Sequence, residues 1–167
     1  DLGGTKVLIA LVDKETGSVI YSVKKKTKKD KGPKNIIRKM VEGIEELLEE
    51  SKVSADEIVS IGIGAAGQVD RENGILIAAA NLDCYDLNIR EKIQEHFNLP
   101  VYLGNDVEIA AIGELKFGAA KGYKDVVCIF VGTGVGSAIV KDGKIIRGAT
   151  GTAGEIGHII VDLKGRP

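Results

Sequence analysis

The chain has 167 residues, of which 44% are hydrophobic and 28% are charged, and its formal net charge is -1. This composition is typical of a folded globular protein and excludes disordered and disulfide-rich classes. A nearly neutral chain has no general attraction for nucleic acid. No apolar run in the sequence approaches the roughly 18 residues of a membrane helix. We therefore expect neither nucleic acid nor a membrane as a partner.

The two cysteines, Cys84 and Cys128, are too few and too far apart for a CxxC zinc site. They are predicted to be buried free thiols of a protein in a reducing compartment, which favours the cytoplasm. The sequence opens directly on a turn-like segment and stops at Gly165-Arg166-Pro167 without a closing helix. We therefore expect a fragment of a longer protein.

The first 50 residues predict an antiparallel hairpin followed by a helix. Residues 7–12 and 18–23 have the apolar pattern of strands, with a turn between them. A lysine-rich run follows, and because no aromatic residues interleave with it, we expect a solvated edge rather than a nucleic-acid surface. From Pro33 to Leu48 the apolar residues recur with helical spacing, which predicts an amphipathic helix.

Strands and helices then alternate along the chain. The predicted elements are a strand at 58–63, a hairpin around 70–77, a helix near 89–97, a strand at 101–103, a helix from about 106 to 118, and strands at 126–131 and 137–140. This order predicts an α/β fold with a mixed sheet: a first lobe over residues 1–120 and the beginning of a second over 121–167. A Rossmann unit does not fit, because the opening turn sits between antiparallel strands.

Two glycine turns are candidate phosphate sites. In Asp1-Leu2-Gly3-Gly4-Thr5-Lys6, the glycines let backbone N–H groups approach a phosphate, while Asp1 could hold magnesium through water. Gly132-Thr133-Gly134-Val135-Gly136 is a second place of close backbone approach. Each turn alone could be purely structural. One turn in each half of the chain suits a nucleotide held between two lobes.

Two further segments carry polar groups for a substrate. Asp106 follows Gly104-Asn105 where a strand passes into a helix, so its carboxylate suits a base. On position alone, a helix cap is the more common role for Asp or Asn at such a point. Gly154-Glu155-Ile156-Gly157-His158 offers a carboxylate and an imidazole for ligand hydroxyls, although such a pair could also be a surface feature.

Taken together, these four motifs resemble the ROK family, named for repressors, open reading frames and kinases. The match spans the whole chain. It implies an actin-like, ribonuclease-H-like ATPase fold and a glucokinase-like phosphotransferase that uses ATP and Mg²⁺. A hexose is the implied substrate, glucose first, with fructose, allose, mannose or an N-acetylated hexosamine as alternatives. A sugar-responsive repressor of the same family is the competing interpretation.

The resemblance also implies a role for each matching residue. Asp106 corresponds to the base that accepts the proton of the sugar hydroxyl. The implied sugar contacts are Gly64, Gly67, Asn81, Asn105, Asp106, Glu155 and His158. The implied ATP and magnesium contacts are Asp1, Gly3, Gly4, Thr5, Lys6, Gly132, Thr133 and Gly134.

The resemblance further implies a structural zinc site and a homo-oligomer, a dimer or tetramer, in the full-length protein. His158 matches one zinc ligand of the family. The family's zinc cysteines would follow Pro167, so we expect no complete zinc site within these residues.

Overall fold

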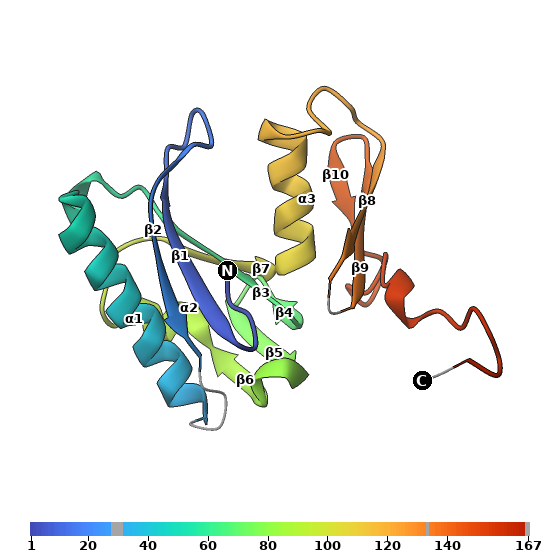
Figure 1. Ribbon diagram of the computed structural model, residues 1–167, viewed down its shortest axis with the longest axis horizontal. Helices are drawn as coiled ribbons and strands as arrows, with labels where there is room; N and C mark the ends of the chain where they lie inside the picture. The colour runs from blue at the N-terminus through green and yellow to red at the C-terminus, as the bar shows by residue number, and fades with distance from the viewer. Residues whose placement is uncertain (28–31, 133, 166–167) are drawn as a thin grey trace. The chain divides into compact units, whose positions relative to one another are not determined.

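The computed structural model describes residues 1–27, 32–132 and 134–165. The chain divides into two compact units, Asp1–Ile109 and Ala110–Pro167. Helix α3 (Asp106–Phe117) carries the chain from the first unit into the second (Figure 1). Each unit therefore has its own strands and its own share of the predicted site residues.

The first unit is built around a mixed sheet. β1 (Lys6–Val12) and β2 (Val19–Lys26) form the predicted antiparallel hairpin, and β3 (Ile61–Ala65) runs parallel to β7 (Val101–Asn105). Leu2 joins the two pairs, because it bridges antiparallel to Val7 and parallel to Ala65. The opening turn thus lies between antiparallel strands, as the sequence predicts.

Helix α1 (Gly32–Ser51) packs against β1 and β2, and α2 (Ile89–Gln94) packs against β7. The apolar stripe of α1 forms the predicted core face, with Ile36 fully buried in the same core cluster as Leu2. Burying one such side chain stabilises the fold by roughly 1.5–3 kcal/mol. Short 3-10 turns, η2 (Ala55–Glu57) and η3 (Ala80–Leu82), connect the larger elements.

A second, antiparallel sheet of the first unit contains β4 (Gln68–Asp70), β5 (Ile75–Ala79) and β6 (Cys84–Asn88). The sequence predicts the first two as a hairpin but not β6. The reason is that β6 lacks an apolar alternation: Cys84 is buried, whereas Tyr85 and Asp86 are exposed. Backbone pairing with β5 holds β6 in place.

The second unit contains the antiparallel strands β8 (Val126–Val131), β9 (Val135–Lys141) and β10 (Lys144–Ile146) (Figure 1). They pair in the order β10-β9-β8. The short turn η4 (Ile156–His158) contacts β9. On β8, Val127, Ile129 and Val131 are largely exposed, whereas Ala138 and Val140 of β9 are buried.

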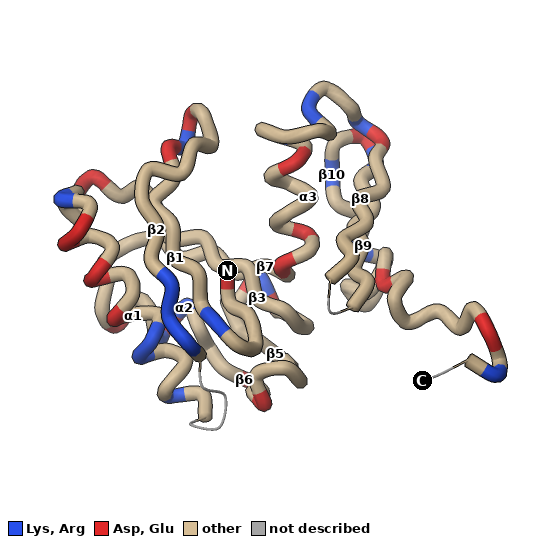
Figure 2. The backbone as a smooth tube through the Cα atoms, viewed as in Figure 1, with Lys and Arg blue, Asp and Glu red and all other residues tan. Residues whose placement is uncertain are grey.

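The lysine-rich run begins on β2, whose end is coloured for basic residues in Figure 2. Lys24 and Lys26 are exposed, and Lys25 pairs with Glu46 of α1. Lys28, Lys29 and Lys31 lie outside the described residues.

No helix among the described residues is long and apolar enough to cross a membrane.

Both cysteines are free thiols. Cys84 is fully buried and Cys128 is half-buried, so the prediction of buried thiols holds fully for Cys84 alone. Burial raises the pKa of both thiols, with a smaller contribution from the neighbouring acidic side chains Asp83 and Glu114 respectively.

Candidate functional site

The opening glycine turn presents two backbone N–H groups. The Gly3 N–H donates to the Lys6 carbonyl at 3.0 Å, which closes the turn. Within the described part of the chain, the N–H groups of Gly4 and Thr5 have no protein acceptor. Thr5 is exposed and Gly4 is partly exposed. The turn can therefore offer two donors to an anion such as a phosphate oxygen.

Gly4 lies directly against Asn81 of η3. A Cβ atom added to Gly4 would be 2.8 Å from the Asn81 carbonyl oxygen and 3.1 Å from the Asn81 Cβ. Any larger residue at position 4 would push the turn and η3 apart. The structure thus places the candidate phosphate turn beside a candidate sugar contact, and Gly4 has a packing reason to be glycine.

The Gly64-to-Gly67 segment lies between the opening turn and the start of α3; its first two residues end β3, so the loop that the sequence predicts from Gly64 begins at Ala66. The Leu2 N–H donates to the Gly64 carbonyl at 2.7 Å. A Cβ atom on Gly64 would be 3.5 Å from the Asp106 Cα, so the two residues are in contact. Gly67 has φ +148°, and a Cβ atom there would be 2.3 Å from the Ala78 carbonyl oxygen. Glycine is required at this position.

Asn105, rather than Asp106, caps helix α3. The Asn105 Oδ1 accepts from the N–H groups of Val107 at 3.0 Å and Glu108 at 3.1 Å. Its Nδ2 donates to the Gly67 carbonyl at 3.2 Å, which ties the cap to the glycine loop. The capping role that position alone suggests therefore belongs to Asn105.

Asp106 is the first residue of α3 and is partly exposed. Its Oδ1 accepts from the Val107 N–H at 2.9 Å, which orients the carboxylate at the helix N-terminus. The positive end of the helix dipole favours a negative group at this position. With the cap supplied by Asn105, the Asp106 carboxylate is available to a ligand.

Four stretches that are distant in the sequence therefore meet in the first unit. The Gly4–Asn81, Gly64–Asp106 and Gly67–Asn105 contacts join them in pairs, and the Leu2–Gly64 hydrogen bond links the opening turn to the second pair. Asp1, Thr5 and Lys6 are exposed on the same turn as Gly4. Backbone amides, a side-chain amide and a carboxylate together can bind phosphate oxygens and sugar hydroxyls.

Sequence reasoning missed Arg90 of α2, which joins the β4–β5 turn to the first residue of β7. Its guanidinium donates to the carbonyls of Arg71 at 2.8 Å, Glu72 at 2.5 Å and Val101 at 3.0 Å. Arg90 thereby fixes the β4–β5 turn against the beginning of β7. A single arginine on an amphipathic helix is ordinarily solvated, so the sequence carries no signal for this role.

In the second unit, the other two motifs both lie beside the start of β9. The Gly132 N–H donates to the Gly134 carbonyl at 2.9 Å, and Thr133 lies outside the described residues. Gly154 has φ +95°, and the Ser137 hydroxyl donates to its carbonyl. A Cβ atom on Gly157 would be 2.1 Å from the Val135 carbonyl oxygen. Close packing therefore explains both glycines of the Gly154–His158 segment.

Glu155 and His158 are both exposed, with the His158 Nε2 4.0 Å from the Glu155 Oε2. Within residues 1–27, 32–132 and 134–165, no group of three or more His, Cys, Asp or Glu side chains could hold a metal ion. The described residues therefore do not fit a structural zinc site, which needs four ligands.

Comparison with known proteins places these features in a family. A glucokinase of Streptomyces coelicolor is 40% identical over 159 residues, covering 95% of this chain and 48% of that protein. A xylose repressor of Caldicellulosiruptor bescii is 33% identical over 164 residues, covering 98% of this chain and 41% of the repressor. The chain thus spans about half the length of the curated relatives that it matches.

A solved structure shows the same fold. A ROK family glucokinase from Streptomyces griseus, in complex with glucose and AMPPNP, is 34% identical with a TM-score of 0.84, over 98% of this chain and 50% of that one. Residues 1–167 match the ROK family as a whole. The chain therefore belongs to the ROK family and has its actin-like ATPase fold.

Proposed function

We propose that this chain is part of an ATP-dependent hexose kinase, with glucose as the first-choice acceptor. The observation that carries the proposal is that the opening turn contacts Asn81 through Gly4 and is joined to Asp106 through Gly64. Its other support is the similarity to a glucokinase at 40% identity and to a glucokinase structure in complex with glucose and AMPPNP.

Asp106 is the proposed base. In phosphoryl transfer through a loose transition state, the protein mainly positions groups and neutralises charge, so a strong base is not required. A carboxylate at hydrogen-bond distance orients the acceptor hydroxyl and then takes its proton, a role worth typically 10²–10⁴-fold. The Val107 N–H holds one oxygen of Asp106, which leaves the other for the hydroxyl.

The opening turn is the proposed first phosphate motif. The N–H groups of Gly4 and Thr5 would donate to phosphate oxygens of ATP, and Gly3 and Lys6 complete the motif. Gly132, Thr133 and Gly134 are proposed as the second phosphate motif. Asp1 would contact Mg²⁺ through water. Its exposed carboxylate fits, since Mg²⁺ keeps several waters and takes one or two carboxylates plus substrate phosphates.

The proposed sugar contacts are Asn81, Asn105, Asp106, Glu155 and His158, and Gly64 and Gly67 shape the backbone beside Asp106 and Asn105. The Asn105 Oδ1 accepts the hydrogen bonds of the helix cap, and one N–H of its Nδ2 donates to the Gly67 carbonyl. Its second N–H is the group proposed to reach the sugar. Asn81 is exposed beside the phosphate turn, where its amide can both donate and accept.

Three further properties are proposed for the full-length protein on the basis of the family resemblance. One is a structural zinc site with His158 as a ligand, and another is a homo-oligomeric state. The third is a cytoplasmic location, which also suits the unpaired thiols of Cys84 and Cys128.

A sugar-responsive repressor is the second candidate, because a xylose repressor is 33% identical over 98% of the chain. The opening turn favours the kinase. A repressor that only senses a sugar needs no phosphate donors, whereas the N–H groups of Gly4 and Thr5 lack protein acceptors within the described residues.

The test is a coupled assay of the full-length protein with ATP, Mg²⁺ and a panel of hexoses. We expect ADP to form only when a hexose is present, with the highest kcat/KM for glucose. The panel also includes the alternative acceptors fructose, mannose, allose and N-acetylmannosamine, each assayed in the same way. Sugar binding without any hexose-dependent ADP formation would contradict the kinase and favour the repressor.

A further inference from the structure

Two backbone carbonyls of the opening turn are held by one buried residue, Thr27. This side chain is fully buried just after β2. Its backbone N–H donates to the Thr5 carbonyl at 3.0 Å, and its hydroxyl donates to the Gly3 carbonyl at 3.3 Å. A single residue therefore holds carbonyls on both sides of Gly4.

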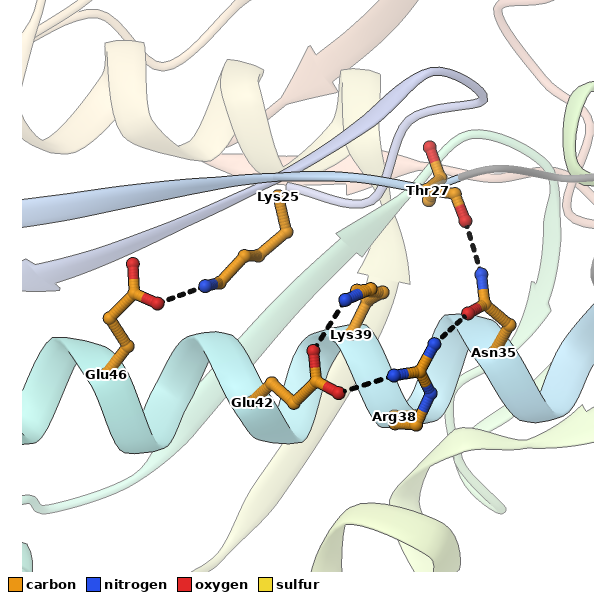
Figure 3. A network of polar contacts seen from close by, with 7 residues as sticks. All are labelled: Lys25, Thr27, Asn35, Arg38, Lys39, Glu42 and Glu46. Carbon is orange, nitrogen blue, oxygen red and sulfur yellow. Dashed lines mark hydrogen bonds and ion pairs between the residues drawn. The ribbon is translucent and has the colours of Figure 1, made fainter.

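Thr27 is itself held by helix α1. The buried Asn35 side chain donates from Nδ2 to the Thr27 carbonyl at 2.6 Å. Arg38 donates to the Asn35 Oδ1 at 2.7 Å and to the Glu42 carboxylate at 2.6 Å (Figure 3). This chain of hydrogen bonds connects the first turns of α1 to the glycine turn.

The geometry of the peptide bond gives the anchor a consequence. The Gly3 carbonyl and the Gly4 N–H belong to one planar trans peptide, in which the C=O and N–H point in opposite directions. Holding the Gly3 carbonyl toward buried Thr27 therefore directs the Gly4 N–H away from the core. That N–H is one of the two without a protein acceptor in the described residues.

The turn needs such an anchor because glycine lies on both sides of this peptide. Glycine populates positive and negative φ about equally, so the Gly3–Gly4 peptide can rotate with little steric resistance. We propose that Thr27, supported by Asn35, is a positioning residue that fixes this peptide so that the Gly4 N–H faces a nucleotide phosphate. The inference rests on the proposed kinase function and extends it to a residue outside the glycine motif.

Two matched pairs of side chains at position 27 separate positioning from packing. Thr27→Val removes the hydroxyl and keeps the shape, whereas Thr27→Ser keeps the hydroxyl and removes a buried methyl. Thr27→Ala, compared with Thr27→Ser, differs by the hydroxyl alone and serves if the valine variant does not fold. Ser51→Ala is the control, since the Ser51 hydroxyl donates to the Leu48 carbonyl far along α1.

The experiment is calorimetric binding of AMPPNP–Mg²⁺ and, separately, of glucose to the full-length protein, with a melting curve for each variant. We expect the Kd for AMPPNP to rise about five- to tenfold in Thr27→Val relative to wild type, and by the same factor in Thr27→Ala relative to Thr27→Ser. This factor corresponds to about the free energy of one hydrogen bond. The Kd for glucose should stay within about twofold, and Ser51→Ala should match wild type.

The decisive result is that AMPPNP affinity and melting temperature change independently. Thr27→Ser should melt at a lower temperature than wild type yet bind AMPPNP normally, and Thr27→Val should bind AMPPNP weakly. If AMPPNP affinity instead follows the melting temperature, or if Thr27→Val binds like wild type, the positioning role is wrong while the kinase proposal stands. A folded wild-type protein that binds no AMPPNP would overturn both proposals.

Discussion

Replacing Asp106 by asparagine isolates its proposed chemistry from its structural role. The helix cap that position alone would assign to this residue is supplied by Asn105, which accepts from Val107 and Glu108 and is unaltered in Asp106→Asn. An asparagine at 106 can still accept from the Val107 N–H as the aspartate does. The variant should therefore keep the local structure and lose the proton acceptor.

The two effects differ in size. Loss of a negative charge at a helix N-terminus costs about 0.3–1 kcal/mol of stability, so the melting temperature should fall by only a few degrees. An amide can orient a hydroxyl but cannot take its proton, so kcat should fall at least about a hundredfold. That factor corresponds to about 2.7 kcal/mol of transition-state stabilisation.

The assay is steady-state kinetics of the full-length protein with glucose and ATP–Mg²⁺, paired with thermal melting. Asp70→Asn is the matched control, because it is also a carboxylate-to-amide change in the first unit and its carboxylate serves a turn by accepting from Asn73. Asp70→Asn should leave kcat within about twofold. A folded Asp106→Asn enzyme with a kcat within a few-fold of wild type would refute the role of Asp106 as the base.

Three other expectations concern the glycine loop and the extent of the chain. Gly67→Ala should destabilise the protein by more than about 2 kcal/mol in denaturant unfolding, since its Cβ would meet the Ala78 carbonyl at 2.3 Å. In Gly62→Ala the new Cβ meets nothing within 4 Å, so an equal loss there would show that the clash is not the cause. The 167-residue chain should bind no stoichiometric zinc by elemental analysis, and extension by about ten to twenty downstream residues should create a site; one tight zinc per chain would contradict this. The same 167-residue chain should turn over glucose far more slowly than the full-length protein, and comparable rates would show that these residues suffice.

Local pattern determined much of the first unit. The apolar spacing of residues 36–48 depends on the helix period alone, and α1 forms where it predicts. The β1–β2 hairpin and the start of α3 at Asp106 follow in the same way from residues close in sequence. The order of the motifs along the chain also identified the family, because four short motifs in that order are specific even when their contacts are unknown.

Tertiary structure alone decided which contacts the residues of the candidate site make. Asn105 and Asp106 are adjacent polar residues, and only the geometry of β7 against the Gly67 loop shows that Asn105 is the cap. The packing reason for Gly4 is Asn81, and the anchor of the Gly3 carbonyl is Thr27. These partners are far apart along the chain. Their contacts form only when distant segments of the first unit pack together, and no local periodicity encodes them.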